Sequence, residues 1–295
     1  MAKIAIVGAG AIGSIVAALL HRTGRHEIVL CVRTAFADLE VAGADGTIRV
    51  KAPIVTDPAK APAVDWVMVC SKAYDAEASA KWFPRLRATG APVAIVQNGV
   101  EHRERFAPYL PADSILPVMV DCPAERDAPG RVRMRGPMYL KVPDSAAGKA
   151  FVQLFDGPGV EATAVADFQS IVWRKLCGNS AGILSALLVK PTGAFHDPSL
   201  TKVALEIVRE CVAVGRAEGA RLGDDVPEAV VAGYRGAKPD SINSLHADRM
   251  AGRPMEIDAR NGAVIRLGRK HGIPTPYNTM AADLLEAAAR LDSYK

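Results

Sequence analysis

The pattern of hydrophobic positions divides the chain into two parts. In the first part, short apolar runs alternate with helical or irregular segments. The runs are Lys3 to Val7, Ile28 to Val32, Trp66 to Cys70, Val93 to Val96 and Ile115 to Val120. This alternation predicts a mainly parallel sheet with right-handed crossovers. We expect the segment Val132 to Val142 to add a shorter, antiparallel edge strand to the same sheet.

After about Ala166 the pattern changes to amphipathic helices separated by proline and glycine, with no further strand pattern. The predicted helices are Ser170 to Leu188, Leu200 to Leu222, Asp225 to Tyr234, Ser241 to Met250, Ile257 to His271 and Thr279 to Leu291. A chain of 295 residues exceeds what one hydrophobic core usually organises. We therefore expect an α/β domain over 1–166 and an all-helical domain over 167–295, with a substrate cleft between them.

The first predicted strand runs directly into Gly8, Gly10 and Gly13, and an apolar helical pattern follows. In a dinucleotide-binding turn the first glycine permits the tight turn, the second admits a pyrophosphate, and the third allows close packing of helix on strand. The phosphates then lie at the positive end of the helix dipole. This predicts a cofactor site at Gly8, Gly10, Ala11, Ile12 and Gly13. The alternative is a glycine-rich turn of purely structural use.

The end of the second strand indicates which nucleotide binds. An acidic side chain there would bind the ribose hydroxyls of NAD, whereas this chain has Arg33 and Thr34. A guanidinium suits the 2′-phosphate of NADP, so we expect NADPH as the cofactor. The alternative is that Arg33 is a solvated loop cation.

Polar residues also follow the later strands of the predicted sheet. Lys72 comes after the third strand, and Asn98 after the fourth, within Gln97-Asn-Gly99. Ligands of such sheets bind beyond the carboxyl ends of the strands, so both side chains are candidate cofactor contacts. The alternatives are a surface lysine and an amide that caps a turn.

The charge distribution and the cysteine and histidine positions limit the kinds of ligand that the chain is expected to bind. The net charge of +4 is spread along the chain, so the sequence does not indicate a basic surface for binding nucleic acid. Arg131, Arg133 and Arg135 form the one dense cationic cluster, and their alternate spacing is typical of the solvated face of a strand rather than an anion site. Scattered cysteines and histidines suggest no metal site and no disulfide framework.

No segment has the sequence pattern of a secretory leader, and no uninterrupted apolar run approaches the ~18 residues that span a bilayer. We expect a cytoplasmic protein without membrane contact. The long apolar helices of the second half allow a homodimer.

Several motifs together resemble the ketopantoate reductases (2-dehydropantoate 2-reductases), and the likeness covers nearly the whole chain. The motifs are Gly8-Ala-Gly-Ala-Ile-Gly13, Lys72, Gln97-Asn-Gly99, Trp173-Arg-Lys-Leu176 with Asn179, and Ser244 through Gly252-Arg-Pro-Met-Glu256-Ile-Asp-Ala-Arg-Asn-Gly262 to Gly272-Ile-Pro-Thr-Pro276. The resemblance implies a Rossmann-type domain and an all-α domain of the 6-phosphogluconate dehydrogenase C-terminal-like kind. It also implies NADPH-dependent reduction of a 2-oxo acid to a 2-hydroxy acid, as in pantothenate biosynthesis.

The same resemblance implies roles for residues in the helical half: Lys175 as the acid catalyst, Glu256 as a carboxylate that orients the substrate, and Asn98, Asn179 and Ser244 as polar substrate contacts. The chemistry agrees, because hydride delivery to a ketone builds negative charge on oxygen that an ammonium stabilises and protonates. Lys175 and Asn179 are four residues apart on one predicted helix and share a face. The alternatives are a solvated helical lysine, a carboxylate that only favours a helix start, and a helical hydroxyl.

One departure concerns the substrate. Where ketopantoate-reducing members usually carry a second asparagine, this chain has Ile183, which removes a hydrogen-bonding amide and predicts a more apolar pocket. Three hypotheses therefore stay open. The first is a reductase of ketopantoate or a more apolar oxo acid, the second an enzyme that reduces a carbon–nitrogen double bond, and the third a non-catalytic NADPH-binding sensor.

Overall fold

The computed structural model describes residues 1–292. The chain forms two compact units, the first over Met1–Phe168 and the second from Gln169 onward. We call them unit 1 and unit 2, and each is described by itself. The predicted boundary between 166 and 167 lies beside this division.

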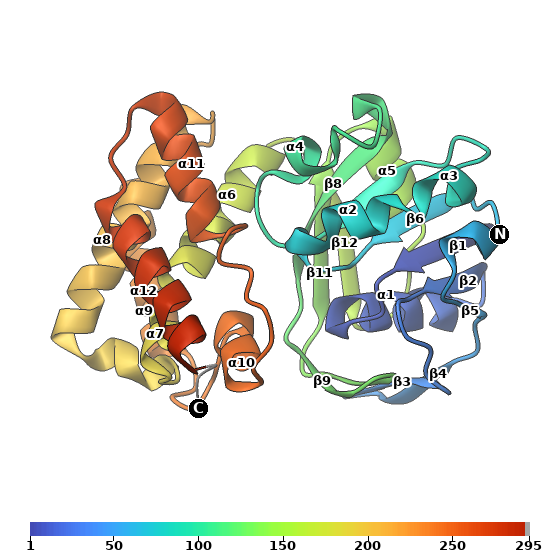
Figure 1. Cartoon of the computed structure of the whole chain (residues 1–295), viewed down its shortest axis with the longest axis horizontal. Helices are drawn as coiled ribbons and strands as arrows, with labels where there is room; N and C mark the ends of the chain where they lie inside the picture. Colours follow the sequence, from blue (N-terminus) through green and yellow to red (C-terminus); the bar gives the residue numbers. More distant parts are fainter. Residues whose placement is uncertain (293–295) are drawn as a thin grey trace. The chain divides into compact units, whose positions relative to one another are not determined.

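Unit 1 contains an eight-stranded sheet (Figure 1). In spatial order its strands are β12 (Val160–Val165), β11 (Met138–Pro143), β8 (Ile115–Asp121), β7 (Val93–Val96), β6 (Trp66–Val69), β1 (Ala2–Val7), β2 (His26–Cys31) and β5 (Ile54–Val55). All neighbouring pairs are parallel except β8 and β11, which are antiparallel. The predicted Rossmann-type arrangement with a mainly parallel sheet is confirmed.

Both faces of this sheet are buried, which explains why its strands are continuous apolar runs. On β1, Ile4 and Ile6 join the core around helix α1 (Ala11–Arg22), while Ala5 and Val7 join the core on the opposite face. That opposite core contains side chains from α3 (Phe83–Leu86) and α4 (His102–Phe106), and Ala76 of α2 (Ala76–Ala80) packs against it. Helix α5 (Ala146–Val152) packs on the α1 face.

A second, four-stranded sheet covers α1 on its far side, so that α1 lies between the two sheets (Figure 1). Its order is β4 (Gly46–Val50), β3 (Leu39–Gly43), β10 (Arg131–Met134) and β9 (Ala124–Ala128). The prediction of one edge strand over Val132 to Val142 was therefore wrong. Gly136 and Pro137 interrupt that segment, so β10 enters the small sheet and β11 the large one. Strand β11 is antiparallel to β8, as expected, but β12 rather than β11 forms the edge.

Unit 2 is helical throughout its described part. Its α-helices are α6 (Phe168–Ala181), which starts one residue before the division, α7 (Ile183–Leu188), α8 (Pro198–Ala217), α9 (Val226–Gly236), α10 (Ser244–Met250), α11 (Asn261–His271) and α12 (Pro276–Asp292). The single helix expected over Ser170 to Leu188 is two helices, α6 and α7, which meet at Gly182. A Cβ atom there would lie 2.6 Å from the hydroxyl oxygen of Tyr234, so a larger residue at the junction would require the Tyr234 side chain to move.

The core of unit 2 is organised around a fully buried tryptophan, Trp173 of α6. Helix α8 approaches its indole closely at Gly215, where a Cβ atom would lie 2.9 Å from the ring. This packing fixes α6, and with it the helical face that carries Lys175 and Asn179. Across residues 1–292, none of the helices has the length and apolar character needed to cross a membrane.

Candidate active site

The turn after β1 has the geometry that the glycine spacing predicts. Gly8 has φ +94°, and a Cβ there would lie 2.8 Å from the backbone nitrogen of Ser71. At Gly13 a Cβ would lie 2.0 Å from the carbonyl oxygen of Gly8, so the glycine lets α1 pack directly on the turn. At Gly10, in contrast, a Cβ would meet no atom within 4 Å, so the backbone there faces open space.

The first turn of α1 offers free amide groups beside this open space. Gly10 is the N-cap and supplies no side-chain cap, and the first turn carries no acidic residue. Ala11 and Ile12, the first two helical residues, are half-buried. An uncapped helix N-terminus next to an unfilled backbone position fits a pyrophosphate, so these residues could hold a dinucleotide.

The strand ends next to this turn are joined by the buried side chain of Gln97. Its Nε2 donates to the carbonyl oxygen of Ser71 at 2.9 Å and contacts that of Lys72 at 3.4 Å. The backbone carbonyl of Gln97 accepts a hydrogen bond from Nε2 of His102 at 2.9 Å. Burial lowers the pKa of this imidazole. Gln97 therefore sets the position of the backbone that carries Lys72 and Asn98, both of which are half-buried.

Arg33 lies just beyond the end of β2. Its side chain is 85% exposed and its nearest ion-pair partner is Asp75, with Nη1 3.8 Å from Oδ1. An ion pair this long and this exposed holds the guanidinium weakly. Arg33 is therefore available to an anionic ligand at the edge where β1, β6 and β7 also end.

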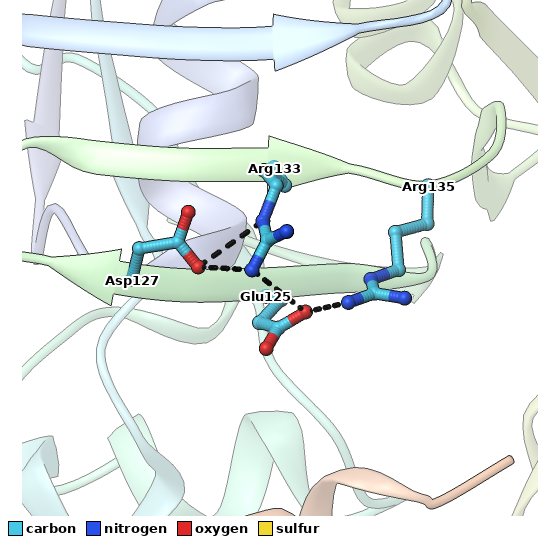
Figure 2. Close-up of polar contacts among 4 residues, drawn as sticks. All are labelled: Glu125, Asp127, Arg133 and Arg135. Atoms are coloured by element: carbon cyan, nitrogen blue, oxygen red, sulfur yellow. Dashed lines mark hydrogen bonds and ion pairs between the residues drawn. The ribbon is translucent and has the colours of Figure 1, made fainter. Parts of the chain in front are cut away.

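The cationic cluster of the small sheet is neutralised by acidic neighbours (Figure 2). Arg133 contacts Asp127 at 2.7 Å and Glu125 at 3.5 Å, and Arg135 also pairs with Glu125. Arg131 pairs with Glu40 through Nε at 3.6 Å. These pairs agree with a solvated strand face and give no support to an anion site.

In unit 2, helix α6 carries Lys175 and Asn179 one turn apart, and both side chains are half-buried. The neighbouring positions Trp173, Leu176 and Cys177 are buried in the core. The core side of α6 thus fixes the rotation of the helix. Lys175 and Asn179 therefore share a helical face, as their spacing predicts.

Glu256 and Asp258 differ in burial, although only one residue separates them. Glu256 is 4% exposed and lies in an irregular segment, whereas Asp258 is exposed and pairs with Arg266 of α11. Arg266 also donates to the Asp258 carbonyl at 2.9 Å. Asp258 therefore has a structural use at the start of α11, and Glu256 is the buried carboxylate of this segment.

Ser244 is the first residue of α10 and lies close to the junction of α6 and α7. The preceding Asn243 caps α10 through the amide of His246 at 3.0 Å and donates to the Gly182 carbonyl at 2.8 Å. The Oγ of Ser244 accepts a hydrogen bond from Nη2 of Arg260 at 2.7 Å. These contacts connect Ser244 to the end of the helix that carries Asn179.

Comparison with known proteins identifies the family. The family model described as ketopantoate reductase PanE/ApbA matches residues 4–147, and the model of its C-terminal domain matches residues 167–289. A 2-dehydropantoate 2-reductase of Caulobacter vibrioides is 48% identical over 98% of this chain and 100% of its own length. The chain belongs to the ketopantoate reductase family.

Solved structures of this family have the same fold. The chain superposes on a ketopantoate reductase from Ralstonia eutropha JMP134 with a TM-score of 0.88 at 30% identity, covering 99% of both chains. It also superposes on a D-mandelate dehydrogenase solved with NADH and anilino(oxo)acetate, with a TM-score of 0.87 at 27% identity over 98% of both chains. As ketopantoate reductases are NADP-dependent oxidoreductases acting on a CH–OH group, the expected enzyme class and cofactor are confirmed at the level of the family.

Two further features of the structure bear on the chemistry of the candidate site. Ile183, at the start of α7, is 0% exposed, so its side chain belongs to the core of unit 2. A substrate could contact it only after neighbouring side chains move. In the part of the chain that the structure describes, no group of three or more His, Cys, Asp or Glu side chains is placed to hold a metal ion.

The sequence reasoning missed Arg260. This arginine is 2% exposed, contacts Ser244, and lies close enough to Tyr234 that its charge lowers the pKa of the phenol, although burial raises that pKa overall to about 12. In the sequence it stands in the first turn of the helix predicted over Ile257 to His271, where an arginine is typically solvated. Its proximity to Ser244 depends on the fold and has no local signal.

Proposed function

We propose that this protein reduces 2-dehydropantoate to pantoate with NADPH as the hydride source. The observation that carries the proposal is the 48% identity, over the full length of the relative, with a protein named 2-dehydropantoate 2-reductase. The residues assigned by the motifs are all present, and they lie at a strand-end edge in unit 1 and around α6 and α10 in unit 2.

Unit 1 supplies the residues for cofactor binding. Gly8, Gly10 and Gly13, with the amides of Ala11 and Ile12, fit the pyrophosphate, because the backbone at Gly10 is open and the helix N-terminus is uncapped. Arg33 would contact the 2′-phosphate, and Lys72 and Asn98 would contact the rest of the cofactor. When bound, the reduced nicotinamide supplies a hydride.

Unit 2 supplies the residues for the proton and the substrate. As hydride reaches the carbonyl carbon, the C=O π electrons move to the oxygen, and the Lys175 ammonium gives that oxygen a proton to complete the hydroxyl. Asn179 would donate to the same oxygen. Glu256 would accept from the substrate hydroxyl, and Ser244 would make a further polar contact.

A second candidate is reduction of a 2-oxo acid with an apolar or aromatic side chain. The similarity to a D-mandelate dehydrogenase over 98% of both chains favours it, as does the replacement of the expected asparagine by Ile183. The burial of Ile183 weakens this second argument, because a core side chain does not line an open pocket.

Oxidation of NADPH followed against a panel of 2-oxo acids separates the candidates. The panel contains 2-dehydropantoate, phenylglyoxylate and a branched-chain oxo acid, each also run with NADH. The highest kcat/KM for 2-dehydropantoate with NADPH is the expected result. A preference for phenylglyoxylate would favour the second candidate, and binding of NADPH without turnover of any oxo acid would contradict both.

A further inference from the structure

A buried arginine, Arg260, contacts the side chain of Ser244. Arg260 is 2% exposed, and its Nη2 donates to the Ser244 Oγ at 2.7 Å. Ser244 itself is exposed at the start of α10. The guanidinium thus lies inside the unit, while the hydroxyl it contacts lies at the surface.

This contact fixes the role of the hydroxyl. Guanidinium has only donors, so Ser244 Oγ must accept from it, and the Ser244 proton remains to be donated elsewhere. A hydroxyl that accepts from a cation is also polarised and becomes a stronger donor. Ser244 therefore presents an O–H donor supported by positive charge.

The charge of Arg260 is not neutralised within its surroundings. Its Nε is buried and has no hydrogen-bond partner, and no ion pair joins the guanidinium to a carboxylate among residues 1–292. The neutral phenol of Tyr234 also lies near the guanidinium, and it donates its own proton to the Gly178 carbonyl at 2.9 Å. Burying a cation with an unused hydrogen-bond donor costs free energy unless a nearby anion offsets the charge.

We propose that Arg260 positions and polarises Ser244 for the carboxylate of the 2-oxo acid substrate. This inference rests on the proposed function. The hydroxyl donates to a carboxylate oxygen, and the charge behind it offsets the negative charge of the bound acid. Arg260 acts through Ser244, so it is a positioning residue, and the pair selects an acid over a neutral ester of the same shape.

The test compares 2-dehydropantoate with its methyl ester in the wild type and in Arg260→Met and Arg260→Lys variants. With Arg260→Met, the KM for the acid should rise roughly 30-fold while the KM for the ester changes little, since one hydrogen bond to a charged group is lost. Arg260→Lys keeps a cation and should recover part of the loss. The matched control is Arg209→Met, because Arg209 is a half-exposed arginine of α8 paired with Glu206 and Glu228. It should change neither KM.

Equal rises for acid and ester would show that Arg260 is only structural and would overturn the proposal, as would no change in either. If Arg260→Met fails to fold, Arg260→Lys is compared with and without Ser244→Ala. The acid-to-ester ratio should then respond to the lysine only when Ser244 is present, and a response in both backgrounds contradicts the proposal. Ligand-induced shifts in Tm, measured with acid and with ester, report recognition without turnover. A wild type that binds the acid selectively but does not reduce it would contradict the proposed function and leave the carboxylate recognition supported.

Discussion

Gly13 faces the carbonyl oxygen of Gly8 so closely that no side chain fits between helix α1 and the turn after β1. The two glycines are thus a packing contact as well as part of the proposed cofactor-binding turn. Because the obstacle is backbone, a Cβ at Gly13 could be accommodated only if the helix or the turn moved.

Gly13→Ala should therefore destabilise unit 1. Overpacking of this kind costs about 1–3 kcal/mol, and the displaced helix N-terminus should also weaken cofactor binding. Denaturant unfolding of the free protein measures the first effect and titration with NADPH the second. An unfolding free energy equal to that of the wild type would contradict the close approach.

Gly10→Ala is the matched comparison and should separate binding from folding. A Cβ at Gly10 meets no protein atom within 4 Å, and its φ of −75° suits alanine. The unfolding free energy should stay within about 1 kcal/mol of the wild type. The Kd for NADPH should rise at least tenfold, roughly, since the methyl group would occupy the path of the pyrophosphate. Unchanged NADPH affinity would argue against binding at this turn.

Arg33→Ala should reduce the preference for NADPH over NADH by roughly 10-fold to 100-fold, because one charge-assisted contact to the 2′-phosphate is lost. The ratio of kcat/KM for the two cofactors measures this. Arg25→Ala is the control, since Arg25 precedes β2 and pairs with Asp156 at 3.9 Å. An unchanged ratio in Arg33→Ala would leave Arg33 as a solvated cation.

Lys175→Ala should lower kcat by about 100-fold to 10,000-fold, the usual contribution of a positioned general acid. The Kd for NADPH should not change, because the proposed cofactor contacts lie in unit 1. Lys202→Ala, an exposed lysine of α8, provides the control. Near-normal kcat in Lys175→Ala would remove the lysine from the mechanism.

Glu218 should contribute stability that depends on pH. Burial raises the pKa of its carboxyl, but hydrogen bonds from Lys270, at 2.7 Å, and from His271 outweigh burial and hold the pKa below its ordinary value of 4.5. A folded-state pKa below the unfolded one adds stability above the unfolded pKa, and that stability is lost as pH falls through the folded pKa.

The unfolding free energy of Glu218→Gln should therefore be lower than that of the wild type at pH 7, and the difference should shrink below about pH 4.5. Glu286→Gln, at an exposed position of α12, should show no such convergence. A Glu218→Gln difference that is the same at every pH would refute the electrostatic origin.

The sequence predicted the parallel core of unit 1 because strands buried on both faces are continuous apolar runs. It did not predict the small sheet, whose strand β9 (Ala124–Ala128) is nearly all exposed and carries the acidic partners of Arg133 and Arg135. Strand β12 was missed for a similar reason, since Val160–Val165 alternates small and polar residues at the edge of the sheet.

In unit 2 the helices were predicted, but the break at Gly182 was not. A lone glycine is tolerated inside a helix, and the atom that would crowd a side chain at Gly182 is the hydroxyl oxygen of Tyr234, which comes from α9. Arg260 was missed in the same way. Its importance lies in contacts between segments that only the fold brings together.

The small sheet has a consequence for how the chain acquires its structure. Strand β3 pairs in parallel with β10, and Arg131 donates to the Asp38 carbonyl across 93 positions of sequence. During synthesis the β3–β4 hairpin therefore emerges long before the strand that completes it, and one edge stays open in the meantime. A nascent chain that ends before β10 also lacks part of the cover of α1 on that side, since β10 contacts the helix beside β3 and β4. We expect fragments truncated before β10 to aggregate, and chaperones to bind the nascent chain mainly at this stage, because β10 lies far along the chain from the β3 strand that it pairs with.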